Sequence, residues 1–95
     1  MLTNNQKQLI INGLSRFHPL KIGVFGSFAR NENTPTSDLD LWVQFEKKVN
    51  LLDIIGIELD LTEQLGIKVD LVTDASIHPK IRPYIEKDLM LIAGD

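Results

Sequence analysis

Every second residue between Asp38 and Phe45 is apolar, and this alternation is the feature that most constrains the fold of the chain. Successive side chains of a β-strand point to opposite faces of the sheet, so the alternation predicts a strand with one face in the core. The apolar set is Leu39, Leu41, Val43 and Phe45, and the opposite set is Asp38, Asp40, Trp42 and Gln44. The chain must therefore build a sheet that is covered on one face and carries two aspartates on the other.

Four further elements are predicted around this strand. Apolar residues at helical spacing indicate an amphipathic helix over Thr3–Phe17, ending before Pro19. A short, partly β-branched run predicts a buried strand over Leu20–Phe25. Asn50 as N-cap and Gly66 as the residue after the last turn bound a helix over Leu51–Leu65. A second alternating run, Ile67–Thr73, predicts a third strand.

Two segments have less regular patterns. Gly26 to Arg30 is expected to form the first turn of a helix, which the polar loop from Asn31 to Ser37 then breaks. Pro79 and Pro83 are typical of the start of a last helical segment, ended by Gly94. The run Leu89–Ala93 is open to a second interpretation, a short edge strand.

Composition limits the class of protein. A chain of 95 residues, 43% of them hydrophobic, has material for one domain with one core, residues 1–95. A formal charge of -3 with scattered Lys and Arg argues against direct nucleic-acid binding. No apolar stretch is long enough to span a bilayer, and there is no cysteine for a disulfide, so we expect a cytoplasmic protein without membrane contact. The expected fold is α/β, a small mixed sheet of three or four strands with helices packed on one face and the carboxylate face open.

The helix over Leu51–Leu65 has more apolar surface than one core face needs. Its apolar residues cover roughly 220° of the helical wheel, wider than an ordinary buried stripe. Either the sheet and the first helix together cover this surface, or Ile57 or its neighbours form part of a protein interface.

The chemically informative residues lie in three short segments. Gly26 lets the chain turn sharply out of a strand, and Ser27 begins a helix whose free N–H groups and positive dipole end attract phosphate. Asp38 and Asp40 point to one strand face, where neighbouring carboxylates attract hard cations. Asp70 completes a cluster of three if its strand pairs beside Asp38–Phe45.

Each of these features taken alone has an ordinary structural explanation. The two aspartates suit the solvent face of an edge strand, the Gly-Ser pair suits a turn, and Asp70 suits a surface. Together, three aspartates facing a phosphate site are what a two-metal nucleotidyl transfer requires, with one Mg²⁺ activating a hydroxyl and the other binding the triphosphate. Asp38, Asp40 and Asp70 are therefore the predicted catalytic and metal-binding residues.

The motifs Gly26-Ser27-Phe28-Ala29-Arg30, Ser37-Asp38-Leu39-Asp40-Leu41 and Val69-Asp70-Leu71 resemble the signature of the DNA polymerase β-like nucleotidyltransferase superfamily. More narrowly, the chain is similar to the minimal nucleotidyltransferase (MNT) proteins, which are encoded beside partners with a HEPN domain. The resemblance covers nearly the whole chain and implies a polymerase β-like nucleotidyltransferase fold.

The resemblance also implies a role for each matched residue. Asp38 and Asp40 would hold two magnesium ions, and Asp70 would hold the catalytic one. Gly26 and Ser27 would bind the β and γ phosphates of ATP. Arg30 matches the family's arginine, and three roles stay open for it: binding phosphate, stabilising transition-state charge, or pairing with a carboxylate of the fold. Asn31 departs from the glycine of many members, but asparagine tolerates the left-handed conformation that the turn needs.

The activity implied by the resemblance is transfer of AMP from ATP to a tyrosine of a HEPN-type toxin, which makes the chain an antitoxin. Two alternatives remain at this stage. One is a non-catalytic module that neutralises its partner by covering it, and the other is a nucleotidyltransferase that acts on a small molecule or an RNA end.

Overall fold

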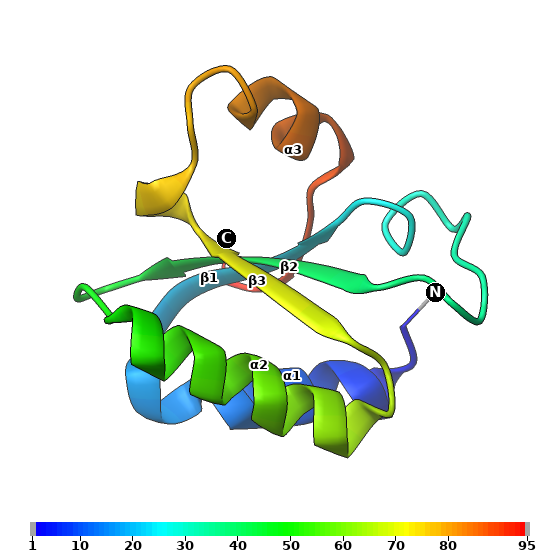
Figure 1. Ribbon diagram of the computed structural model, residues 1–95, viewed down its shortest axis with the longest axis horizontal. Coiled ribbons are helices and arrows are strands. Elements are labelled where there is room, and N and C mark those ends of the chain that lie inside the picture. Colours follow the sequence, from blue (N-terminus) through cyan, green and yellow to red (C-terminus); the bar gives the residue numbers. More distant parts are fainter. Residues whose placement is uncertain (1, 95) are drawn as a thin grey trace.

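Four strands form one mixed sheet in the order β3-β2-β1-β4 in the computed structural model, which describes residues 2–94 (Figure 1). The strands are β1 (Pro19–Phe25), β2 (Leu39–Phe45), β3 (Val69–Thr73) and β4 (Met90–Ala93). β1 is antiparallel to β2 and to β4, whereas β2 and β3 run parallel. The predicted α/β class with a small mixed sheet is confirmed.

Two long helices cover one face of this sheet. They are α1 (Asn4–Leu14), which continues into the 3-10 helix η1 (Ser15–Phe17), and α2 (Leu51–Leu65). The short helix α3 (Arg82–Asp88) and the 3-10 helix η2 (Asp74–Ser76) lie on the other side of the sheet (Figure 1). The prediction of helices on one face thus holds for α1 and α2, and α3 is the exception.

The ends of α1 and α2 follow from their capping residues. Thr3 and Gln6 form a reciprocal capping box at the start of α1. The Asn50 side chain accepts a hydrogen bond from the Asp53 amide at 2.8 Å, and Gly66 ends α2 with a left-handed φ of 71°. Both predicted ends of α2 are confirmed.

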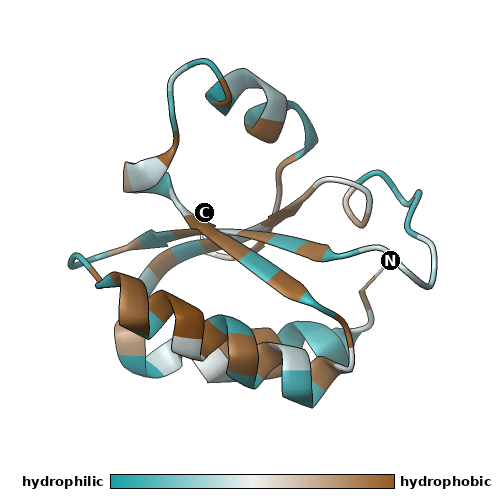
Figure 2. Cartoon of the chain, in the orientation of Figure 1, coloured by the Kyte–Doolittle hydropathy of each residue, from teal (hydrophilic) through white to brown (hydrophobic). Residues whose placement is uncertain are grey.

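The core lies between the sheet and the two long helices. The side chains of Leu39, Leu41 and Val43 are fully buried there, as the alternation in β2 predicted. From the helices they meet Ile10, Leu14 and Leu61. Brown apolar segments line the space between the helices and the sheet in Figure 2. Burial of this face fixes which side of β2 is left for polar residues.

Helix α2 also holds the outer edge of β3. The amide of Val69 donates to Thr62 Oγ1 at 3.0 Å, and the amide of Leu71 donates to Glu58 Oε2 at 2.8 Å. β3 is an end strand of the sheet, so these bonds satisfy amides that would otherwise face solvent. They fix the backbone on both sides of Asp70.

The apolar surplus on α2 divides into a buried and an exposed part. Ile57 is only 4% exposed and belongs to the core, so the suggestion that Ile57 itself lies in an interface is wrong. Its neighbours Leu51, Leu52, Ile55 and Leu59 are exposed, up to 79% for Leu52. We call these four residues the α2 apolar stripe.

Two predicted segments differ from the structure. The segment from Gly26 to Arg30 forms one helical-type bond, from the Arg30 amide to the Gly26 carbonyl at 3.1 Å, and no helix follows. Asn31 takes the left-handed conformation, with φ of 58°, as its residue type allows.

The last predicted helix, from Pro79 to Gly94, is too long. α3 ends at Asp88 because Leu89 is extended, and the chain then pairs with the free edge of β1 as β4. The alternative of an edge strand near Leu89–Ala93 is confirmed. Across residues 2–94, every helix is too short or too polar to cross a lipid bilayer.

Candidate active site

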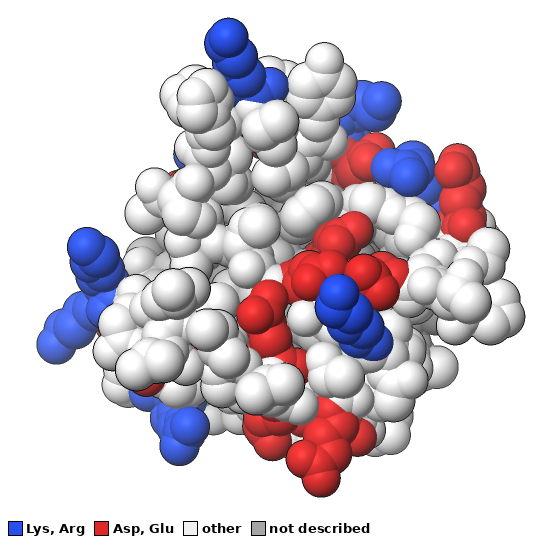
Figure 3. All heavy atoms as spheres, viewed as in Figure 1, with Lys and Arg blue, Asp and Glu red and all other residues white. Residues whose placement is uncertain are grey.

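Asp40 and Asp70 are direct neighbours on parallel strands. The register pairs Asp40 with Asp70 and Leu39 with Val69. Adjacent strands are about 4.8 Å apart, so the two side chains leave the sheet side by side. Asp38 lies two residues before Asp40 and therefore has the same facing. Figure 3 shows acidic side chains gathered on this side of the molecule.

The electrostatics of Asp40 reflect this crowding. Burial raises the pKa of the Asp40 carboxyl above its ordinary value, and the negative charges of Asp70 and Asp38 raise it further. Arg30 acts in the opposite direction. Like charges at this spacing disfavour the ionised form unless a cation neutralises them. The local field therefore favours binding of a positive ion.

Gly26 lies on the other side of Asp40. The register pairs Phe25 with Asp40, so the chain leaves β1 and turns directly beside the carboxylate. Gly26 has a φ of 72°, which L side chains rarely adopt, and a Cβ at this position would overlap the Asp40 carboxylate. The positive φ and the closeness of the Asp40 carboxylate both disfavour a side chain at this position.

Ser27 follows in the same turn, with its carbonyl accepting from the Glu32 amide at 2.9 Å. Because no helix starts at Ser27 in the described residues, a helix dipole is not part of this site. An anion beside Asp40 would meet the amides of a tight turn instead.

Arg30 ties this turn to the end of α3. Its guanidinium donates to the Asp88 carboxylate, and a weaker contact of 3.4 Å joins it to Glu32. The hydrogen bond to Asp88 is the main reason that the pKa of Arg30 is raised. Of the three roles considered for Arg30, carboxylate pairing is the one that the structure contains, and phosphate contact stays a prediction.

Lys68 lies beside Asp38 and was not among the predicted site residues. Its Nζ is 3.8 Å from Asp38 Oδ2, and its carbonyl accepts from the Leu39 amide at 2.8 Å. The alternation in Ile67–Thr73 puts Lys68 on the same face as Asp70, and this signal could have identified it. Within residues 2–94, no three acidic or histidine side chains stand ready to hold a metal ion.

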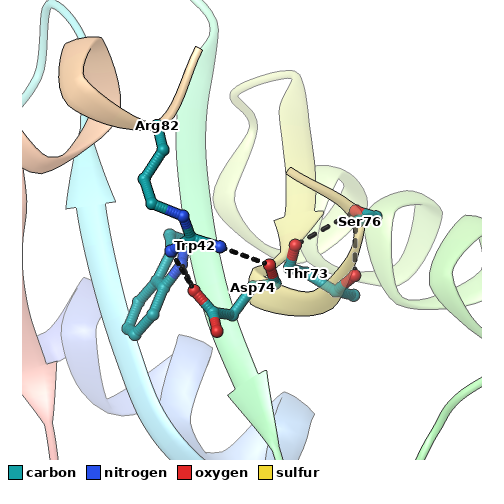
Figure 4. A network of polar contacts seen from close by, with 5 residues as sticks. All are labelled: Trp42, Thr73, Asp74, Ser76 and Arg82. Atoms are coloured by element: carbon teal, nitrogen blue, oxygen red, sulfur yellow. Dashed lines mark hydrogen bonds and ion pairs between the residues drawn. The ribbon is translucent and has the colours of Figure 1, made fainter. Parts of the chain in front are cut away.

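A network of hydrogen bonds links η2 and α3 to β2 on the carboxylate side of the sheet (Figure 4). Asp74 Oδ1 accepts from Arg82 Nη1 at 2.8 Å and from the buried Trp42 indole at 3.3 Å. Arg82 Nη2 also donates to the Asp74 carbonyl at 3.1 Å. The bond from Arg82 lowers the pKa of the Asp74 carboxyl. Asp74 is thus a paired carboxylate, unlike Asp40.

The sequence matches a known protein family and several named relatives. The model of the family described as "nucleotidyltransferase domain" matches residues 8–92. A protein of Methanocaldococcus jannaschii with a proposed protein adenylyltransferase assignment is 47% identical over 72 residues, covering 75% of this chain and 74% of its own. The protein adenylyltransferase MntA of Thermococcus cleftensis is 36% identical, covering 97% of this chain and 89% of its own.

A solved structure has the same fold. It is the complex of a tri-AMPylated HEPN toxin of Shewanella oneidensis with an MNT antitoxin, and the match has a TM-score of 0.81. It covers 99% of this chain and 74% of the matched chain at 19% identity, so the likeness is one of fold.

Proposed function

Because the chain belongs to the nucleotidyltransferase domain family, we propose that it transfers AMP from ATP to a tyrosine of a HEPN-type toxin in the cytoplasm. The transfer would silence the toxin, and the chain would act as an antitoxin. The observation that carries this proposal is the pairing of Asp40 with Asp70 directly beside the Gly26 turn. A cation held by these carboxylates would lie next to an anion held at the turn, as transfer from a triphosphate requires.

The donor set fits magnesium by its chemistry. Mg²⁺ prefers carboxylate oxygens, and the pKa of Asp40 is raised first by burial and then by the neighbouring negative charges of Asp70 and Asp38. Asp38, Asp40 and Asp70 are not arranged as a ready-made cluster, so their carboxylates would have to turn toward one another to hold two ions. Bound Mg²⁺ would make the acceptor hydroxyl more acidic and offset charge on the departing pyrophosphate.

The chain's own residues would place the nucleotide. The Gly26 and Ser27 amides would donate to the β and γ phosphates, because the absence of a Cβ on Gly26 lets a ligand approach the backbone closely. Asp70, fixed on both sides by α2, would accept the proton of the attacking hydroxyl. Arg30 would add positive charge near the phosphates only if it exchanged Asp88 for a phosphate oxygen.

A protein acceptor is favoured by the surface of α2. The α2 apolar stripe is exposed over four residues, and folded proteins rarely leave such patches uncovered. The names of the relatives, protein adenylyltransferases, and the fold shared with an MNT antitoxin support the same class of partner.

The test is to identify a HEPN-domain protein encoded next to this gene, co-express the two chains and measure the intact mass of that partner. We expect a gain of one or more AMP masses, which is lost when Asp40 or Asp70 is replaced by asparagine. A partner of unchanged mass with the unaltered chain would contradict the proposal. Relief of toxicity that survives Asp38→Asn with Asp40→Asn would mean that the chain acts by occlusion.

If labelled AMP appears instead on RNA or a small molecule with no protein partner present, the acceptor assignment is wrong. Incubation of the purified chain with ATP labelled at the α phosphate separates these outcomes in one experiment. Gel filtration of the products assigns the label to protein, RNA or small molecule.

A further inference from the structure

We propose that Lys68 is a built-in counter-cation for Asp38, which competes with the divalent ion and so sets the metal affinity of the site. The inference rests on the proposed function, since it concerns the same carboxylates. Its geometric basis is the ion pair of Lys68 Nζ with Asp38 Oδ2 at 3.8 Å.

The position of Lys68 is fixed by the sheet. The Leu39 amide donates to the Lys68 carbonyl at 2.8 Å, and the next residues, Leu39 and Val69, are register partners. Lys68 and Asp38 are therefore neighbours across the parallel ladder, and Lys68 faces the same way as Asp70. The backbone keeps the ammonium within reach of Asp38 even though its side chain is 69% exposed.

The other nearby cation is engaged elsewhere. Arg30 pairs with Asp88 and Glu32, so it contributes to Asp40 only through its longer-range field. Among the ion pairs of residues 2–94, the pair of Lys68 with Asp38 is the only one that involves Asp38, Asp40 or Asp70. Figure 3 shows a positively charged side chain lying among the acidic ones on this side.

Competition follows from charge and geometry. A divalent ion that uses both oxygens of Asp38 must displace the ammonium, and the ion also feels repulsion from it at short range. An exposed ion pair is weak and is easily exchanged for a stronger ligand. Lys68 therefore lowers metal affinity modestly and offsets part of the Asp38 charge when no metal is bound.

The experiment is titration of the whole chain with Mn²⁺, which takes the same oxygen ligands as Mg²⁺, with free Mn²⁺ measured by electron paramagnetic resonance. Lys68→Met should bind Mn²⁺ about two- to fivefold more tightly, the range expected for removal of one exposed ion pair. Lys68→Arg should stay close to the unaltered chain. Lys48→Met removes the same charge from an exposed site beyond the end of β2 and should change little.

A double-mutant cycle separates a direct contact from a general charge effect. If Lys68 acts mainly through Asp38, Lys68→Met should have a smaller effect on Mn²⁺ affinity once Asp38 is asparagine, because only the direct repulsion between the ammonium and the ion remains. An equal effect in both backgrounds, an effect matched by Lys48→Met, or weaker Mn²⁺ binding in Lys68→Met would each overturn the inference. Failure of the unaltered chain to bind Mn²⁺ at all would instead refute the proposed metal site and the inference with it. Circular dichroism of each variant verifies that it is folded.

Discussion

The substitution Asp40→Asn should stabilise the fold of the metal-free protein at neutral pH. Asp40 is next to Asp70 across the ladder, and its charge is partly desolvated. Two carboxylates about 5 to 7 Å apart repel by about 0.6 to 3 kcal/mol as the effective dielectric falls from that of water to that of a protein surface. We expect a gain of about 1 kcal/mol, because the group is partly solvated. For a chain of this length that raises Tm by about 4–8 °C.

Asp74→Asn is the matched control, and we expect it to lower the stability of the fold where Asp40→Asn raises it. The Asp74 carboxylate is paired with Arg82 and the Trp42 indole, so its charge stabilises the fold. Loss of that charge weakens both hydrogen bonds and should cost about 1 kcal/mol. Both substitutions remove one negative charge without changing side-chain size, so a net-charge effect would move both variants in the same direction.

The stability difference between each variant and the unaltered chain should change with pH in a defined direction. Because the pKa of Asp40 is raised in the fold, the folded protein takes up a proton on Asp40 at a higher pH than the unfolded chain does. The destabilisation caused by the ionised Asp40 carboxylate therefore decreases as pH falls through the raised pKa. The advantage of Asp40→Asn should therefore be complete at neutral pH and vanish below the ordinary pKa of a carboxyl. For Asp74 the pKa is lowered, so the wild-type advantage is present above the ordinary pKa and is lost as pH falls through the lowered value.

Thermal unfolding followed by circular dichroism, without metal and at several pH values, measures these differences. Addition of Mg²⁺ and a non-hydrolysable ATP analogue should reverse the order of Asp40→Asn and the unaltered chain, because bound ligand stabilises the state that holds it. A Tm for Asp40→Asn equal to or below that of the unaltered chain at pH 7, without metal, would refute the reasoning about uncompensated charge.

Three further predictions concern the turn, the arginine and the α2 apolar stripe. Gly26→Ala and Gly66→Ala should each cost about 1–2 kcal/mol, since both positions have positive φ, but only Gly26→Ala displaces Asp40 and should abolish AMP transfer in the labelled-ATP assay. Arg30→Ala should match Asp88→Ala in KM for ATP if Arg30 only pairs within the fold, whereas a rise seen with Arg30→Ala alone would indicate phosphate contact. Leu59→Asp should change the free energy of unfolding by less than about 0.5 kcal/mol and should prevent co-purification with the HEPN partner; retained co-purification would exclude this surface.

The elements that the sequence predicted well are those that one local pattern determines. The alternation in β2 and the caps of α2 depend only on neighbouring residues, and both were confirmed. Asn31 took the left-handed conformation that its residue type allows. Asp40 and Asp70 were also found on adjacent strands with the Gly26 turn beside them, and the buried face of β2 leaves only the opposite face for its aspartates.

The elements that local patterns missed depend on distant parts of the chain. Met90–Ala93 forms a strand because the edge of β1, more than 60 residues earlier, is open to pairing. Arg30 pairs with Asp88, 58 residues away, and no local spacing indicates this contact. The turn after Gly26 stops short of a helix because the Glu32 amide closes on the Ser27 carbonyl instead of continuing the helical pattern.

The register of the candidate site is enforced by the hydrophobic core. β2 is flanked by β1 on one side and β3 on the other, so Asp40 is the position that meets both the Gly26 turn and Asp70. A slip of β2 by one residue would turn Leu39 and Leu41 to solvent and force the two aspartates into the core. Each buried, unpaired carboxylate would cost several kcal/mol, more than the modest repulsion between the aspartates on the open face. Burial of Leu39 and Leu41 therefore fixes the register of β2, and this register keeps Asp40 next to Asp70 despite the repulsion between the two carboxylates.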